Sequence, residues 1–140
     1  MKPDDEAIST NAAPPPVGAY PHARRAGGFL FLSGLGPRDP AGGDIPGVRR
    51  DADGRVADYD IEAQCHAVFR NVKSVLEASG SGWDRLVDVT VFLTDIERDF
   101  EAFNRIYAEY FPGEGPCRTT VEVNRLPTPI AIELKCIATL

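Results

Sequence analysis

The hydrophobic pattern changes its period between residues 60 and 93, and this change restricts the chain to folds that combine helices with strands. Up to Ser79, apolar residues recur every three or four positions and so lie on one side of a helix: Ile61, Cys65, Val68, Val72, Val75 and Leu76. Asp58 or Asp60 is suited to cap this helix, and Gly80 to end it. In Leu86–Leu93, apolar residues alternate with polar ones, as in a strand with one buried face.

Other segments complete the predicted fold. A short apolar strand is predicted at Gly28–Ser33, and a second helix at about Asp99–Phe111, where aromatic residues share one face. Strands at Cys117–Val123 and Ile130–Thr139 flank a turn with two prolines, which predicts an antiparallel hairpin. A further strand is expected within Gly47–Arg50, in a long loop rich in glycine and proline. This order predicts an α+β fold, with two helices packed on one face of a mixed sheet.

The length of 140 residues suits one domain with one core. The segment Asn11–Pro16 ends in three prolines, which favour an extended backbone over a helix. We therefore expect residues 1–16 to form a flexible N-terminal arm and residues 17–140 to form a single domain.

Charge and composition exclude several kinds of partner. Acidic residues outnumber basic ones by 21 to 15, and the resulting charge of −6 argues against binding nucleic acid or an anionic membrane. The apolar runs are too short to span a bilayer, and the acidic N-terminal stretch does not resemble a secretory signal. Three cysteines without paired spacing are typical of a reduced protein, so a cytoplasmic location is expected.

The motifs of cofactor enzymes are absent from the sequence. It contains no glycine-rich nucleotide loop, and its two histidines and scattered cysteines do not have the spacing of metal ligands. We expect no metal and no cofactor, and any catalysis to rely on carboxylates, arginines, backbone groups and water.

The predicted C-terminal hairpin brings two charged residues together. With the turn centred between Arg125 and Leu126, Arg118 and Glu133 lie on the same rung, with Cβ atoms about 5 Å apart. An odd shift in register would move one of them to the other face. Two interpretations stand: a solvated ion pair, or an arginine that grips a substrate carboxylate beside a glutamate that handles a proton or water.

Three further residues are weaker candidates. Tyr20 and His22 place an aromatic hydroxyl and an imidazole near the start of the first predicted strand, although a loop tyrosine is more often a packing residue. Asn104 interrupts the apolar side of the second predicted helix, where its amide either points into a site or is solvated.

Several motifs together resemble the reactive-intermediate deaminase (RidA/YjgF) family. They are Val17–Tyr20, Phe31–Gly34, Asn71–Lys73, Leu76–Gly80, Val89–Asp95, Phe100–Asn104 and Arg118–Pro127, of which the last is the most specific. Within the family, Gly18–Gly27 and Pro116–Thr120 are most similar to the 2-aminomuconate deaminases. The resemblance implies a chorismate-mutase-like fold and a homotrimer with active sites between subunits; whether trimers pair into a hexamer stays open.

The same resemblance implies roles for single residues. Arg118 would bind the substrate carboxylate, Glu133 would position or activate the attacking water, and Tyr20 and Asn104 would line the pocket. Thr120 stands where many members carry a cysteine, which puts specificity for 2-aminoacrylate in doubt; its hydroxyl is a candidate donor to the intermediate.

These observations predict a hydrolytic deaminase of 2-aminomuconate, which yields a 2-oxo dicarboxylic acid and ammonia in the breakdown of aromatic compounds. For the second carboxylate of this substrate, His22 ranks ahead of Arg24 and Arg38. Two alternatives stay open. One is a generalist deaminase of 2-iminopropanoate or 2-aminoacrylate, and the other is a non-catalytic trimer that binds small carboxylates.

Overall fold

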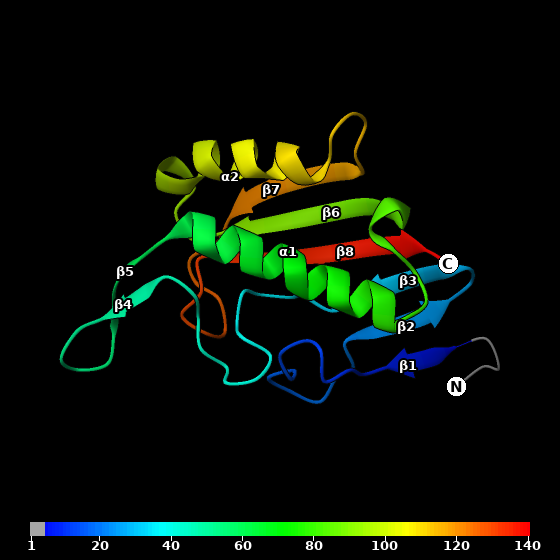
Figure 1. Cartoon of the computed structure of the whole chain (residues 1–140), viewed down its shortest axis with the longest axis horizontal. Helices are drawn as coiled ribbons and strands as arrows, with labels where there is room; N and C mark the ends of the chain where they lie inside the picture. Colours follow the sequence, from blue (N-terminus) through cyan, green and yellow to red (C-terminus); the bar gives the residue numbers. More distant parts are fainter. Residues whose placement is uncertain (1–4) are drawn as a thin grey trace.

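A six-stranded mixed sheet with two helices on one face forms the body of the molecule (Figure 1). The computed structural model describes residues 5–140. Helix α1 spans Ile61–Ala78 and helix α2 spans Ile96–Tyr110. The predicted α+β architecture, with two helices on a mixed sheet, is confirmed.

Both helices begin at aspartate caps. The Asp60 side chain accepts hydrogen bonds from the backbone N–H groups of Glu62 and Ala63, which satisfies two donors that a helix start leaves free. Asp95 caps α2 in the same way by accepting from the Arg98 N–H, so α2 begins three residues before the predicted Asp99. The apolar stripe predicted on α1 is buried against the sheet.

The strands of the main sheet follow the order β1-β2-β3-β8-β6-β7. Their bounds are Glu6–Ile8 (β1), Ala23–Ala26 (β2), Phe29–Leu32 (β3), Leu86–Leu93 (β6), Cys117–Glu122 (β7) and Ile132–Thr139 (β8). Neighbouring strands are antiparallel except β6 and β7, which are parallel. Strands β4 (Val48–Arg50) and β5 (Val56–Tyr59) form a separate hairpin beyond the start of α1 (Figure 1).

The predicted hairpin of the last two strands is wrong. Strand β6 lies between β7 and β8, so Arg118 is opposite Val89 while Glu133 is opposite Phe92. The reason is the connection: α2 links β6 to β7, and a helical crossover brings the next strand in parallel to the first. The chain then passes β6 and adds β8 on its other side.

The expected N-terminal arm also needs correction. Residues 1–4 lie outside the described part of the chain, but Glu6–Ile8 form β1, which pairs with β2 at the edge of the sheet. Strands β1, β2 and β5 have no apolar alternation, which is why the sequence did not predict them.

The core fills the layer between the helices and the sheet. The sheet contributes fully buried aliphatic side chains, including Leu30, Leu32, Val91, Leu93 and Ile132. On the opposite face of the sheet, Phe29 and Phe31 of β3, Val87 of β6 and Val121 of β7 remain exposed. Within residues 5–140, no helix is long and apolar enough to cross a membrane.

Candidate active site

Glu133 occupies the face of the sheet that the helices leave uncovered. In β8, Ile132 and Leu134 point into the core, so the side chain between them points the other way. Burial alone raises the pKa of the Glu133 carboxyl. No cation pairs with it among residues 5–140. The Glu133 carboxyl therefore holds a proton more readily than an exposed one.

A glycine makes room for this carboxylate. A Cβ atom at Gly34 would lie 2.7 Å from Glu133 Oε2, closer than non-bonded atoms approach. Tyr20, Arg38 and Glu133 line a small pocket together with Gly34. Tyr20 is exposed, and its hydroxyl accepts a hydrogen bond from the Val17 N–H at 3.3 Å. We name Tyr20, Gly34, Arg38 and Glu133 the glutamate cluster.

Arg118 lies on the opposite face of the sheet, against α2. Its partner across the ladder is Val89, whose side chain is buried under the helices. The Cζ atom of Arg118 lies 4.7 Å from the centre of the Tyr107 ring and 5.3 Å from that of Phe103. The rings hold the guanidinium by cation–π contact. In the described chain, no Asp or Glu forms an ion pair with Arg118, which leaves its charge available for a ligand carboxylate.

Two unpartnered hydroxyls lie on the Arg118 side. Thr120 Oγ1 and the Tyr107 hydroxyl are both buried without a hydrogen-bond partner. Thr120 follows Arg118 by two residues in β7 and so shares its face, and Asn104 of α2 is exposed one turn before Tyr107. Burial raises the pKa of Tyr107 to about 12. We name Asn104, Tyr107, Arg118 and Thr120 the arginine cluster.

The two clusters cannot form one site within a single chain. Between their rungs on β6, Val89 and Phe92, lie three residue steps, or roughly 10 Å along the strand. Their side chains also point to opposite faces, so the predicted contact between Arg118 and Glu133 is wrong. Strand β7 is, however, the edge of the sheet, so the arginine cluster borders an edge that a second chain can approach.

His22 has a structural position. It is only 3% exposed, its Nδ1 accepts from the Thr10 N–H, and its Nε2 lies 2.8 Å from the Pro14 carbonyl oxygen. Since both ring nitrogens are used, the ring offers no free donor for the substrate-binding role predicted from the sequence. It instead ties the N-terminal segment to the start of β2.

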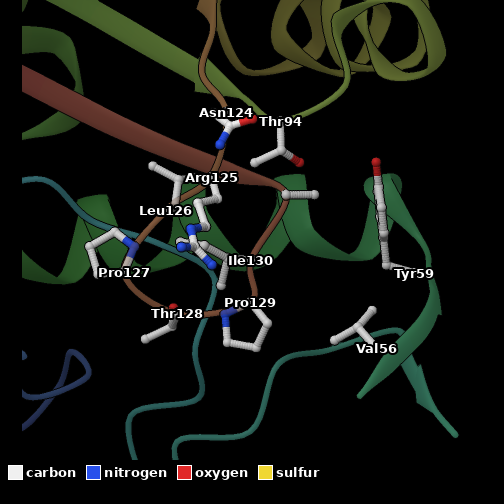
Figure 2. Close-up of a pocket in the computed structure, with 11 residues that line it drawn as sticks. Val56, Tyr59, Thr94, Asn124, Arg125, Leu126, Pro127, Thr128, Pro129 and Ile130 are labelled. Atoms are coloured by element: carbon white, nitrogen blue, oxygen red, sulfur yellow. The ribbon is translucent and has the colours of Figure 1, made fainter.

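A larger cavity of about 420 Å³ also borders the Pro127–Ile130 turn (Figure 2). Tyr59 and Val56 of β5 form one wall, and the loop from Asn124 to Ile130, with Arg125, forms the other (Figure 2). None of the site residues predicted from the sequence lines it. Among residues 5–140, no three His, Cys, Asp or Glu side chains gather closely enough to hold a metal ion.

Sequence reasoning missed two residues of these clusters as site residues. Tyr107 looked like one of several core aromatics, and Gly34 like the end of a strand. Arg38 was ranked behind His22 for the second carboxylate. For Tyr107 a signal existed, since it lies three residues after Asn104 on the same helical face.

Comparison with known proteins identifies the family of this chain. A family model described as Endoribonuclease L-PSP matches residues 10–140. A RutC family protein of Pyrococcus horikoshii is 41% identical over 133 residues, which cover 95% of this chain and 96% of the relative. The chain belongs to the RidA/YjgF family.

Other members support the same assignment at the level of structure. The Rid family protein YyfA of Yersinia pestis superposes with a TM-score of 0.84 at 35% identity, covering 97% of this chain and 99% of the other. The structure of Escherichia coli TdcF with bound serine gives a TM-score of 0.83 at 30% identity, covering 96% and 98%. The Arabidopsis thaliana relative named Reactive Intermediate Deaminase A, chloroplastic, is 38% identical over 96% of this chain and 66% of its own length.

Proposed function

We propose that this RidA/YjgF family member is a cofactor-independent hydrolase that converts enamine and imine carboxylates to 2-oxo acids and ammonia. The observation that carries the proposal is the pair of unsatisfied charges. Glu133 is half-buried without a cation, and Arg118 is held by aromatic rings without a carboxylate. The names of relatives agree, since one is a reactive-intermediate deaminase and another holds serine, a small amino carboxylate.

Arg118 binds the carboxylate next to the reacting carbon. A guanidinium presents two parallel N–H donors to a carboxylate, so it holds both the position and the plane of the substrate. Tyr107 and Phe103 hold the guanidinium in place before the substrate arrives. The unpartnered hydroxyl of Thr120 and the side-chain amide of Asn104 can form hydrogen bonds with the tetrahedral intermediate.

Glu133 acts first as the general base and then as the general acid. A proton from solvent adds to the enamine carbon and gives an iminium, whose C=N carbon is attacked by water. The Glu133 carboxylate takes a proton from that water and returns it to the departing amine. The C–N bond breaks, a C=O bond forms, and the products are a 2-oxo acid and ammonium. Tyr20 lines the same pocket and contributes a hydroxyl beside the reacting carbon.

This chemistry requires more than one chain, because the two clusters lie on opposite faces of the sheet. We propose a homotrimer in which the arginine cluster of one subunit meets the glutamate cluster of the next; pairs of trimers would give a hexamer. The exposed Phe29, Phe31, Val87 and Val121 on the uncovered face support this assembly, since such apolar side chains are commonly buried between subunits. A closed ring makes every interface equivalent, and therefore three equivalent sites.

For the substrate we propose 2-aminomuconate, a dicarboxylate. The support is the resemblance of Gly18–Gly27 and Pro116–Thr120 to the 2-aminomuconate deaminases, with Thr120 in place of the common cysteine. The generalist alternative is fitted equally well by the family relationship. Ammonia release from 2-aminomuconate and from 2-aminoacrylate, each formed in situ and compared with the spontaneous rate, separates the two. If neither compound is turned over faster than its spontaneous rate, the deaminase proposal is overturned and a carboxylate-binding trimer is favoured.

Mixing two inactive variants tests the shared site. Arg118→Ala and Glu133→Gln chains are unfolded together and refolded as an equal mixture. About three quarters of randomly assembled trimers are mixed, and each has one intact interface, so about one quarter of the wild-type turnover is expected. Each variant refolded alone is the control. Recovery no greater than the sum of the controls would contradict a site built from two subunits.

A further inference from the structure

The glutamate cluster contains a cation that the proposed mechanism does not use. Arg38 lines the pocket that Tyr20, Gly34 and Glu133 share. It also lines an adjoining pocket, to which Ser33 and Gly34 contribute. Among the described residues that line these two pockets, it is the only Lys or Arg. A positive charge beside a pocket proposed to bind carboxylates is suited to bind a negatively charged group of the ligand.

The backbone at Arg38 is held firmly. The Asn71 side chain, which is 1% exposed on α1, donates from Nδ2 to the carbonyl oxygens of both Gly36 and Arg38, at 2.8 and 2.9 Å. Although Arg38 lies in a long loop, this double contact fastens its position to the helix layer. The side chain therefore starts from a fixed point beside the pocket.

The Arg38 guanidinium is held by one hydrogen bond and has further N–H donors to offer. Its Nη2 donates to the Pro15 carbonyl oxygen at 2.7 Å, and a guanidinium has five N–H donors. No carboxylate among residues 5–140 forms an ion pair with it, and Glu133 in the same pocket owes its raised pKa to burial alone. The remaining donors are available to a ligand.

The other candidate cations are less suitable. Both ring nitrogens of His22 are used within the chain, and Arg24 of β2 lines neither pocket. Arg125 lines the cavity drawn in Figure 2, and no residue of the glutamate cluster lines that cavity.

We propose that Arg38 binds the far carboxylate of a dicarboxylic substrate and so determines specificity. Arg118 of one subunit holds the carboxylate beside the reacting carbon, Glu133 of the next supplies the proton transfer, and Arg38 holds the other end of the chain. The site thereby prefers diacids over monocarboxylates of the same length. This inference rests on the proposed deaminase function.

The test uses two six-carbon substrates that differ only at the far end. These are 2-iminoadipate, which ends in a carboxylate, and 2-iminohexanoate, which ends in a methyl group; an amino-acid oxidase generates each in situ. In Arg38→Gln we expect kcat/KM to fall about ten- to hundredfold for 2-iminoadipate, the effect of losing one charge-assisted contact, and to change less than about twofold for 2-iminohexanoate. Arg38→Lys keeps the positive charge but loses the two parallel N–H donors of the guanidinium, so its kcat/KM for 2-iminoadipate should lie between those of the wild type and Arg38→Gln.

Two controls separate the possible causes. Arg70→Gln removes one positive charge from the exposed side of α1, so it measures the effect of net charge alone. Calorimetric titration of the same variants with adipate and with hexanoate gives the same comparison without turnover.

Each other outcome has a clear meaning. An equal loss on both substrates would make Arg38 a structural residue, and no loss on either would exclude it from the site; both results overturn this inference and leave the deaminase intact. Selective loss in Arg125→Gln instead would move the far carboxylate to the cavity of Figure 2. A wild-type protein that neither turns over nor binds these acids overturns the proposed function and this inference together.

Discussion

A carboxylate placed in a half-buried pocket without a cation costs folding free energy, and Glu133 is such a group. Burial raises its pKa in the folded chain, so the fold favours the protonated form. The cost is absent below the ordinary glutamate pKa, grows as the pH rises, and is complete above the raised pKa. A side chain retained at this cost is typical of a functional site.

The first prediction follows from the direction in which this cost changes with pH. Glu133→Gln should be more stable than the wild type at pH 7, and the gain should shrink towards zero as the pH falls to about 4, because the wild-type carboxyl is then protonated. Urea unfolding at both pH values measures this, and turnover at pH 7 should be lost. Glu109→Gln, at an exposed position on α2, controls for the loss of one negative charge. A stability difference independent of pH would contradict the assignment.

Gly34 provides a second test at the scale of one residue. Its missing Cβ is what lets Glu133 Oε2 approach, because a methyl carbon only 2.7 Å from this oxygen would force the carboxylate aside. Gly34→Ala should lower kcat about tenfold or more, since a displacement of about 1 Å from the productive geometry is costly. The atom displaced is the end of a flexible side chain, so stability should change by less than about 1 kcal/mol.

A matched control exists for this variant. Gly42→Ala places the same methyl group in an open loop, where the nearest atom is 3.9 Å away, and should leave kcat unchanged. If Gly34→Ala keeps full turnover, the position of the Glu133 carboxylate at Gly34 does not matter for the reaction.

At the scale of elements, the Asn71 side chain connects α1 to the loop before β4. Asn71 donates to two loop carbonyls from a buried position. Asn71→Ala leaves both carbonyls without this donor, so the free energy of unfolding should fall by about 1–3 kcal/mol in urea denaturation. Lys73→Ala, at an exposed position on the same helix, should change it by less than about 0.5 kcal/mol. Equal effects would show that the loop is held by other contacts.

Elements with a strong internal pattern were predictable from the sequence. Helix α1 and strand β6 have apolar residues at the period of their structure. The Asp60 cap marks the start of α1, and Gly80, which follows the C-cap Ser79 with a positive φ, marks its end. Pairing between strands was not predictable in the same way. Two prolines between β7 and β8 look like a hairpin turn, but adjacent strands along a chain need not be neighbours in a sheet.

For the candidate site too, the sequence indicated the single residues but not how they are arranged in space. The residue types and the family motifs pointed to Arg118, Glu133, Tyr20, Asn104 and Thr120 as site residues, and their roles stay predictions. Their grouping depended on the register between strands, and the structure divides them between two faces. The two ring contacts of His22 involve backbone groups eight and twelve residues away, which no side-chain pattern reveals.

At the scale of the whole molecule, the proposed trimer places the uncovered face of the sheet between subunits. Phe31 of β3 lies on this face, is 40% exposed, and neighbours Ile137 across the ladder. In a trimer built on this face, a charge at Phe31 would be buried against another subunit without a partner, which costs several kcal/mol. In a single chain the same charge faces water and the fold tolerates it.

Phe31→Glu should therefore separate assembly from folding. We expect its far-UV circular dichroism to match the wild type, its mass by light scattering to fall from that of three chains to that of one, and its turnover to disappear, because Arg118 and Glu133 no longer share a site. Ala78→Glu adds the same charge at an exposed position at the end of α1 and should stay assembled and active. A Phe31→Glu protein that remains a trimer with full turnover would place the subunit interface elsewhere, whereas a monomer with full turnover would mean that one chain holds the complete site.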